Sequence, residues 1–79
     1  MKLAKMRDWL KSLREQAELT QQQIADKLGI TKQYYQMIEA GNRQQNMDLT
    51  LCSKLSELFG ISLEEIAIKE TELKAQEVT

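Results

Sequence analysis

The stretch TKQYYQMIEAG, residues 31–41, places lysine and glutamine side chains beside two adjacent tyrosines and closes on an acid and a glycine. A lysine donates hydrogen bonds through its ammonium group, and a glutamine amide both donates and accepts them. Such a segment can be a helix that presents polar atoms to a partner, or an ordinary surface helix whose apolar side is buried. The elements around it decide between these two interpretations.

The sequence lacks the residues that usually carry out catalysis. There is no histidine, no metal-ligand spacing and no glycine loop that could cradle a phosphate, and Cys52 is the single thiol. Acid–base, nucleophilic and metal-assisted catalysis all need such groups. Glu64 and Glu65 fit the start of a helix, where the dipole favours acids without any catalytic role. We therefore expect no enzyme, no cofactor and no metal site, with Cys52 a small buried apolar residue rather than a redox switch.

The length of 79 residues predicts one small domain that buries about two-thirds of the surface its unfolded chain exposes. We expect residues 1–74 to form this domain and residues 75–79 to fray. The single cysteine, the lack of a charged-then-apolar leader and the lack of an apolar run of ~20 residues favour the cytoplasm and argue against a membrane partner.

Charge is divided unevenly along the chain, although its net value is only -1. Residues 1–45 hold eight Lys or Arg and five acids, a balance of +3, whereas residues 46–79 hold three Lys and seven acids, a balance of -4. This asymmetry suggests that one end of the domain faces phosphates while the other faces away. Chance clustering on a solvated surface is the alternative.

The sequence predicts an all-α chain, because it has no proline, three glycines and many helix-forming residues. Apolar residues at helical spacing predict a first helix over about 3–17: Leu3, Met6, Leu10, Leu13 and Ala17. Thr20 as N-cap, with Gln23 completing a capping box, predicts a second helix that ends at Gly29.

Three further helices follow the same signals. Thr31 as N-cap and Gly41 as stop bound a third helix with Tyr35 and Ile38 on its inward face, which leaves Tyr34 exposed. Asp48 opens a fourth helix that ends at Gly60, with an inward face of Leu49, Cys52, Leu55 and Phe59. Ser62, with Glu65 as its capping-box partner, opens a fifth helix with an inward face of Leu63, Ile66 and Ala67.

The second and third helices are joined by the short turn GIT, residues 29–31, and so form a helix-turn-helix, whose second helix can lie in a DNA major groove. The segment LTQQQIADKLGITKQYYQMIEAGNR resembles the Cro and phage-repressor type of helix-turn-helix, the Xre family. The turn, both caps, the Ile-Glu-x-Gly close and the later LFGISLEEI fall in register across residues 6 to about 68. The resemblance implies a five-helix lambda-repressor-like DNA-binding domain with the third helix as recognition helix.

The resemblance also implies roles for individual residues. Gln21 is expected to brace the DNA backbone, and Lys32, Gln33 and Met37 are expected to face the bases. The full implied DNA-binding set is Gln21, Thr31, Lys32, Gln33, Tyr34, Gln36, Met37, Asn42 and Arg43. Arg14 and Glu39 occupy the places of a structural ion pair.

The residue types fit this interpretation, because glutamine can bond an adenine edge in two places, lysine can reach guanine acceptors, and methionine can touch a thymine methyl. A polar solvated face without DNA binding is the alternative for this helix. For Arg43 the alternative to a phosphate contact is an untethered surface arginine. The chain departs from the family pattern at Glu18, where many members have glycine between the first two helices.

The sequence as a whole predicts a DNA-binding transcriptional regulator that acts as a repressor, binding double-stranded DNA as a homodimer at a palindromic operator. Ile68 and Leu73, with Val78 beyond them, are apolar and lie off the predicted inward face of the fifth helix, so they are the candidates for the dimer contact. The competing class is an antitoxin or helical interaction module whose main partner is a protein.

Overall fold

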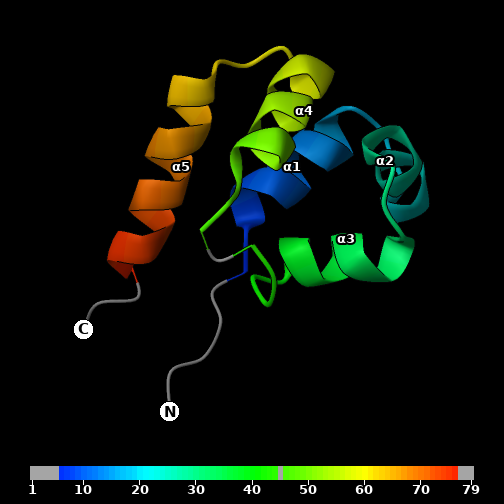
Figure 1. Cartoon of the computed structure of the whole chain (residues 1–79), viewed down its shortest axis with the longest axis horizontal. Coiled ribbons are helices and arrows are strands. Elements are labelled where there is room, and N and C mark those ends of the chain that lie inside the picture. The colour runs from blue at the N-terminus through cyan, green and yellow to red at the C-terminus, as the bar shows by residue number, and fades with distance from the viewer. Residues whose placement is uncertain (1–5, 45, 77–79) are drawn as a thin grey trace.

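The computed structural model describes residues 6–44 and 46–76, with side chains through residue 73. In these residues the chain forms α-helices and no strand: α1 Asp8–Gln16, α2 Gln21–Leu28, α3 Lys32–Glu39, α4 Leu49–Phe59 and α5 Leu63–Gln76. The predicted all-α class with five helices is confirmed. Figure 1 shows α3 lying across one end of the molecule, with α4 and α5 running side by side from the opposite end. No helix in this part of the chain is long and apolar enough to cross a membrane.

The starts of α2, α3, α4 and α5 are fixed by side-chain caps that the sequence predicted. Thr20 Oγ1 accepts from the Gln23 N–H at 3.0 Å, and Gln23 Oε1 accepts from the Thr20 N–H at 2.9 Å, which closes the capping box of α2. Asp48 Oδ1 accepts from the Leu51 N–H at 2.8 Å and Ser62 Oγ from the Glu65 N–H at 3.0 Å. Each cap satisfies an N–H that the helix itself cannot bond, so these helices begin at defined residues.

One apolar core joins the five helices. Its buried members are Leu10, Ile24, Ala25, Leu28, Tyr35, Ile38, Leu51, Leu55 and Ile66. Since each helix contributes at least one of these side chains, the core fixes how α3 lies relative to the other four.

The predicted start of the first helix, at about residue 3, is wrong for the described residues: α1 begins at Asp8, and Leu3 lies outside them. Met6, expected on the inward face, is 49% exposed, and Ala17 at the other end is also exposed. The cause of the later start is Arg7, whose N–H donates to the Glu39 carbonyl at 2.8 Å. The chain at this point bonds to the end of α3 instead of continuing the helix.

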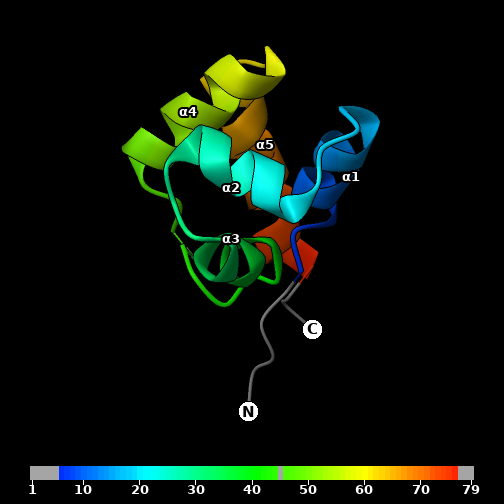
Figure 2. The same cartoon turned by 90° about the vertical axis from the view of Figure 1, so that its right-hand side faces the viewer.

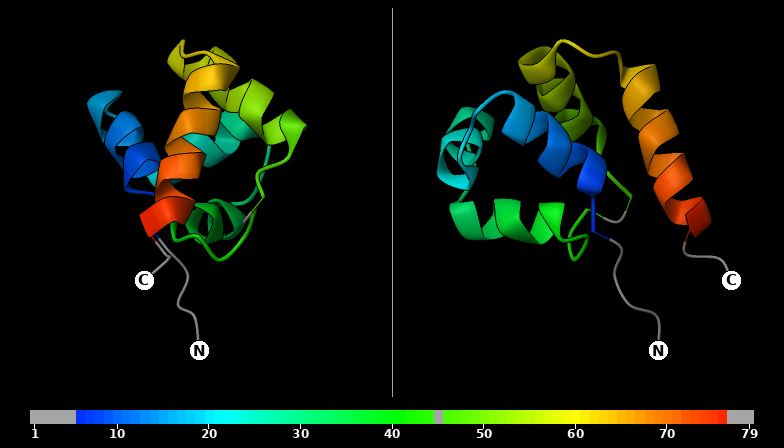
Figure 3. Two further views of the ribbon diagram at one scale, coloured as in Figure 1. Left: turned by 90° about the vertical axis from the view of Figure 1, so that its left-hand side faces the viewer. Right: turned by 180° about the vertical axis from the view of Figure 1, so that it is seen from behind.

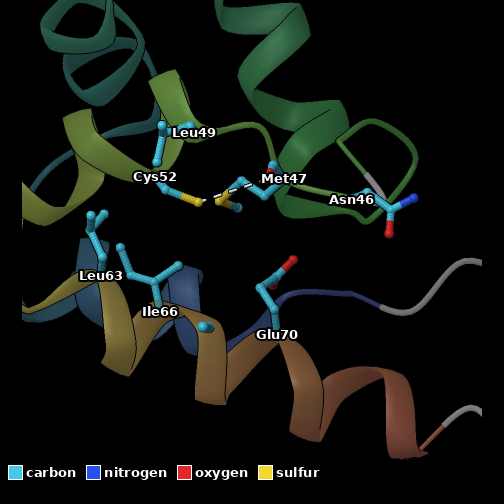
Figure 4. Close-up of a pocket in the computed structure, with 8 residues that line it drawn as sticks. Asn46, Met47, Leu49, Cys52, Leu63, Ile66 and Glu70 are labelled. Carbon is cyan, nitrogen blue, oxygen red and sulfur yellow. Dashed lines mark hydrogen bonds between the residues drawn. The ribbon is translucent and has the colours of Figure 1, made fainter.

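The inward faces predicted for the last two helices are also partly wrong. Leu49 is 70% exposed, and Leu51 is buried in its place beside Leu55. In α5 only Ile66 of the predicted set is buried, whereas Leu63 is 45% exposed and Ala67 is exposed. The reason is that α5 lies along one side of α4 and leaves an open hollow where their first turns face each other (Figure 4).

Candidate nucleic-acid interface

The corner between α2 and α3 is built by a short turn with one residue in a left-handed conformation. Gly29 ends α2 at φ 73°, a conformation that glycine adopts without steric cost. Ile30 then packs against the core, and Thr31 Oγ1 caps α3 by accepting from the Tyr34 N–H at 3.1 Å. Figure 2 shows α2 crossing over α3 at this corner. The turn therefore sets the angle at which α3 is presented.

The exposed face of α3 is polar and continuous. Four side chains spaced i, i+1, i+4 and i+5 share this face, because residues three or four apart on a helix are neighbours. They are Lys32, Gln33, Gln36 and Met37, all exposed. Tyr35 and Ile38 on the opposite face are fully buried. The helix is therefore anchored by one side while the other offers donors, acceptors and a thioether to the outside.

Gln21 and Gln36 connect the start of α2 to this exposed face. Gln36 Nε2 donates to Gln21 Oε1 at 3.0 Å, and Gln21 Nε2 donates to Glu39 Oε1 at 3.3 Å. The two amides thus hold each other in place at the surface where α2 and α3 meet. A side chain fixed in this way loses less conformational entropy when it contacts a partner.

Beneath them, Glu39 is a buried carboxylate with several donors around it. Arg14 Nε lies 2.9 Å from Glu39 Oε2, and the Tyr35 hydroxyl donates to the same oxygen at 2.5 Å. Burial by itself raises the pKa of Glu39, but the bonds from Arg14, Tyr35 and Gln21 outweigh it and lower that pKa below its ordinary value. Burial and then Glu39 raise the pKa of the Tyr35 hydroxyl far above its ordinary value. The carboxylate is therefore held ionised and ties α1 to α3.

Tyr34 differs from its predicted exposure. It is half-buried and packs against the core, and its hydroxyl accepts from Gln44 Nε2 at 2.8 Å. Gln44 reaches it because the loop turns back at this point, with Gln44 at φ 58°. The ring therefore supports the loop that follows α3, and a DNA contact by Tyr34 remains a prediction.

The loop after α3 carries Asn42 and Arg43 at the surface. Both residues are exposed, and both backbone N–H groups donate to the Met37 carbonyl, at 2.8 and 3.2 Å. Arg43 Nη1 donates to the carbonyl of its neighbour Asn42 at 3.2 Å. The exposed guanidinium lies at the rim of α3, in a position to meet an anion.

A depression of about 600 Å³ opens where α1, α2 and α3 meet. Its walls come from all three helices and include Met6, Lys11, Arg14, Thr20, Gln21, Gln22, Lys32 and Glu39. Lys11 and Lys32 bring positive charge to it, and the first turn of α2 offers backbone N–H groups there. An anionic group such as a DNA phosphate fits these features.

Sequence reasoning missed two residues, one at this interface and one buried behind it. Lys11 stands on an exposed turn of α1, and no spacing rule connects it to Lys32. Arg7 is 1% exposed although it carries a charge, and it bonds to residues more than 30 positions away. Neither has a local signal, since the places of both side chains depend on how α1 packs.

A second hollow, of about 390 Å³, separates α4 from α5 (Figure 4). Leu49 and Cys52 of α4 face Leu63 and Ile66 of α5 across it. Burial raises the pKa of the Cys52 thiol, which keeps it protonated and poorly nucleophilic. The lining of this hollow is mainly apolar, in contrast to that of the depression at the α2–α3 corner.

Comparison with known proteins agrees with this geometry. The sequence model of a helix-turn-helix family matches residues 10–66. An uncharacterised helix-turn-helix type transcriptional regulator of Bacillus subtilis is 42% identical over 55 residues, which cover 70% of this chain and 46% of that protein. A second one, from Methanocaldococcus jannaschii, is 37% identical over 65 residues, covering 82% of this chain and 96% of that protein.

The chain therefore spans about half the length of the first relative and nearly all of the second. No solved structure gives a significant match.

Proposed function

The chain belongs to the helix-turn-helix family of transcriptional regulators, and from this premise we propose that it is a sequence-specific DNA-binding repressor that acts as a homodimer on a palindromic operator. The observation that carries the proposal is the exposed polar face of α3, held in place by a fully buried opposite face. This is the arrangement that a helix needs to enter a major groove, where base edges present donors and acceptors.

The proposed contacts divide by position. Lys32, Gln33 and Met37 face the bases from the outer side of α3, with Gln36 beside them. Gln21, at the start of α2, faces the backbone. The remaining contacts are at the two ends of α3: Thr31, Tyr34, Asn42 and Arg43.

Two copies of the chain are needed to recognise a DNA site selectively. A single recognition helix touches only a few base pairs, whereas two copies spaced by one DNA turn of roughly 34 Å double the contacts and match a palindrome. The described chain measures 35 × 26 × 22 Å, so two copies oriented along a shorter axis fit side by side at that spacing. Pairing must use a surface away from α3.

We place the two-fold contact on α5. Ile68 is 51% exposed and Leu73 is half-buried, while Val78 lies outside the described residues. Leu49 and Leu63 are also exposed, at the hollow between α4 and α5. Burying these side chains against a second copy would remove apolar area from water.

The same exposed apolar side chains support a second candidate, an antitoxin or interaction module that binds a different protein. The two functions differ in what they predict for DNA. A regulator binds random-sequence DNA with a steep salt dependence, because phosphate contacts release counterions, whereas a module that binds only protein does not bind DNA.

The experiment is a titration of random-sequence DNA at two salt concentrations, followed by selection of bound sequences from a random pool. The proposal expects weaker binding at higher salt and a selected motif with two half-sites about one DNA turn apart. Absence of binding at low salt would leave the protein-binding module as the function. A selected motif with a single half-site would overturn the homodimer.

A further inference from the structure

The Arg7 guanidinium uses all of its hydrogen-bonding capacity inside the protein. An arginine side chain has five N–H donors. Nε donates to Glu70 Oε2 at 2.9 Å, Nη1 donates to the carbonyls of Ile38 at 2.6 Å and Arg43 at 3.0 Å, and Nη2 donates to Glu70 Oε1 at 2.8 Å and to the Gln44 carbonyl. With 2% of the side chain exposed, this is a buried junction rather than a surface ion pair.

One side of the junction is the end of the recognition helix and the loop behind it. Ile38 lies in the last turn of α3, where the helix dipole favours a cation, and Arg43 and Gln44 lie in the loop of residues 42–44. Arg7 bonds a carbonyl at each of these three residues. It therefore fixes the backbone path that places the Arg43 side chain at the rim of α3.

The other side of the junction is α5. Glu70 meets Arg7 through both carboxylate oxygens, and Trp9 Nε1 also donates to Glu70 Oε2 at 2.9 Å. Figure 3 shows the start of α1 lying between the end of α3 and the far end of α5. Figure 4 shows the Glu70 carboxylate directed away from α5. Glu70 is thus a tether by which α5 holds Arg7 in place.

We propose that Arg7 is a positioning residue for DNA binding. Through its bidentate bond with Glu70, Arg7 couples the docking of α5 to the placement of the 42–44 loop. The inference rests on the proposed function, because it concerns the same DNA contact by Arg43. It adds a route by which a change at α5, such as pairing with a second copy, alters affinity for DNA.

The coupling follows from the charge of the buried group. Without the negative charge of Glu70, the Arg7 guanidinium is a buried cation whose remaining partners are carbonyl groups. Movement of the guanidinium toward water restores its hydration. Such a movement breaks its bonds to Arg43 and Gln44 and releases the loop. Couplings between sites typically change affinity by about 5- to 150-fold, and we expect about tenfold here.

The test compares Glu70→Gln with Glu72→Gln, an exposed acid of the same helix. Both variants lose one negative charge, so the general gain in attraction to DNA is common to both. Affinity for random-sequence DNA is measured for each, alone and combined with Arg43→Ala. We expect binding about tenfold weaker for Glu70→Gln than for Glu72→Gln, and expect this difference to disappear in the Arg43→Ala background.

If the difference in affinity between the two Gln variants disappears in the Arg43→Ala background, Glu70 acts by positioning Arg43. Simple destabilisation of the fold would weaken binding equally with or without Arg43. Equal affinities of the two Gln variants, or a difference that persists without Arg43, would overturn the coupling. If Glu70→Gln does not fold, Glu70→Asp replaces it and Glu72→Asp becomes its control, since both keep the negative charge. The shorter acid cannot reach both Arg7 nitrogens, so the same Arg43-dependent loss of affinity is expected.

A readout without DNA keeps this test distinct from that of the proposed function. The amides of Asn42 and Arg43, which bond the Met37 carbonyl, are expected to exchange hydrogen faster in Glu70→Gln than in Glu72→Gln. The emission of Trp9, the single tryptophan, should shift in the same variant. Wild-type protein that binds no DNA overturns the proposed function, whereas unchanged exchange at these two amides overturns the coupling.

Discussion

At the scale of the residue, the α2–α3 corner depends on a few buried polar groups. Glu39 accepts from Arg14, Gln21 and Tyr35, so one carboxylate connects three helices. With side chains 12% and 7% exposed, Arg14 and Glu39 are largely shielded from water. Pairs of this kind cost more to break than surface pairs, because the remaining charge stays desolvated.

Replacing Arg14 by Met should lower the free energy of unfolding by about 3 kcal/mol, since Glu39 would lose its ion-pair partner while remaining buried. A double-mutant cycle with Glu39→Gln, measured by urea denaturation, isolates the pairwise part. Additive effects of the two substitutions would mean that the pair contributes nothing specific.

The same pair gives stability a pH dependence of known sign. The folded protein lowers the pKa of Glu39, so its contribution to stability is complete above the ordinary glutamate value of about 4.3 and is lost as pH falls through the lower folded value. The difference in unfolding free energy between wild type and Glu39→Gln should therefore shrink below about pH 4. Glu15→Gln, an exposed site on α1, controls for the lost charge. A difference that stays constant down to pH 2 would contradict the depressed pKa.

Gln33 and Arg43 should respond differently to substitution, because base edges and phosphates carry different information. Gln33→Ala is expected to weaken binding to the selected operator by about 1–3 kcal/mol with little effect on random DNA. Arg43→Ala should weaken binding to all sequences and reduce the slope of log affinity against log salt by about one. Both are measured by titration at several salt concentrations, and equal loss of specificity in the two variants would refute these roles.

At the scale of the element, the turn between α1 and α2 stores strain. Glu18 adopts φ 57°, a region that side chains with a Cβ enter at a cost. Its place is fixed by its neighbours, since the N–H groups of Glu18 and Leu19 bond back to Glu15 and Arg14. Glu18, in place of the glycine of many family members, therefore raises the energy of the turn. It does not change how α1 and α2 are placed, because the core fixes both helices.

Glu18→Gly should raise the free energy of unfolding by about 1 kcal/mol, because relief of the strained φ exceeds the added entropy of glycine in the unfolded chain. Glu18→Ala is the control, since it removes the same charge but retains a Cβ. Thermal unfolding of the three proteins measures the effect. An alanine variant as stable as the glycine variant would show that charge, not backbone strain, is responsible.

At the scale of the whole molecule, the two surfaces differ in chemistry. The α2–α3 corner carries Lys11 and Lys32, whereas the surface formed by α4 and α5 exposes Leu49, Leu63 and Ile68. Five of the seven acids of the second half of the chain lie on these last helices: Glu57, Glu64, Glu65, Glu70 and Glu72. A polar surface for DNA and an apolar one for a second copy fit this division.

The variant Ile68→Lys, Leu73→Lys should sediment as a lighter species than wild type at equal concentration, since it places two charges in the proposed contact on α5. Two control variants carry changes at exposed sites of the same helix. Thr71→Lys, Glu72→Lys introduces the same number of lysines, and Thr71→Lys, Glu72→Gln adds the same net charge as the test variant. Identical sedimentation of the test variant and wild type would exclude this surface as the dimer contact.

The sequence by itself determined the elements and their order, because caps, glycine stops and apolar spacing are local. Thr20, Thr31 and Asp48 start helices where predicted, and Gly29 and Gly60 end them in the left-handed conformation. The buried position of Tyr35 and the polar outer face of α3 follow from the same periodicity. The family pattern predicted α3 as the recognition helix.

Only the tertiary structure decided which charges are buried and how the helix ends are joined. Arg7 and Glu70 are 63 positions apart, and no local pattern pairs them or predicts that Arg7 would stop α1 from starting earlier. The exposure of Leu49 and Leu63 likewise depends on where α5 lies against α4. Local signals fix a helix through bonds within a few residues, whereas these features arise from packing between segments that meet only in the folded chain.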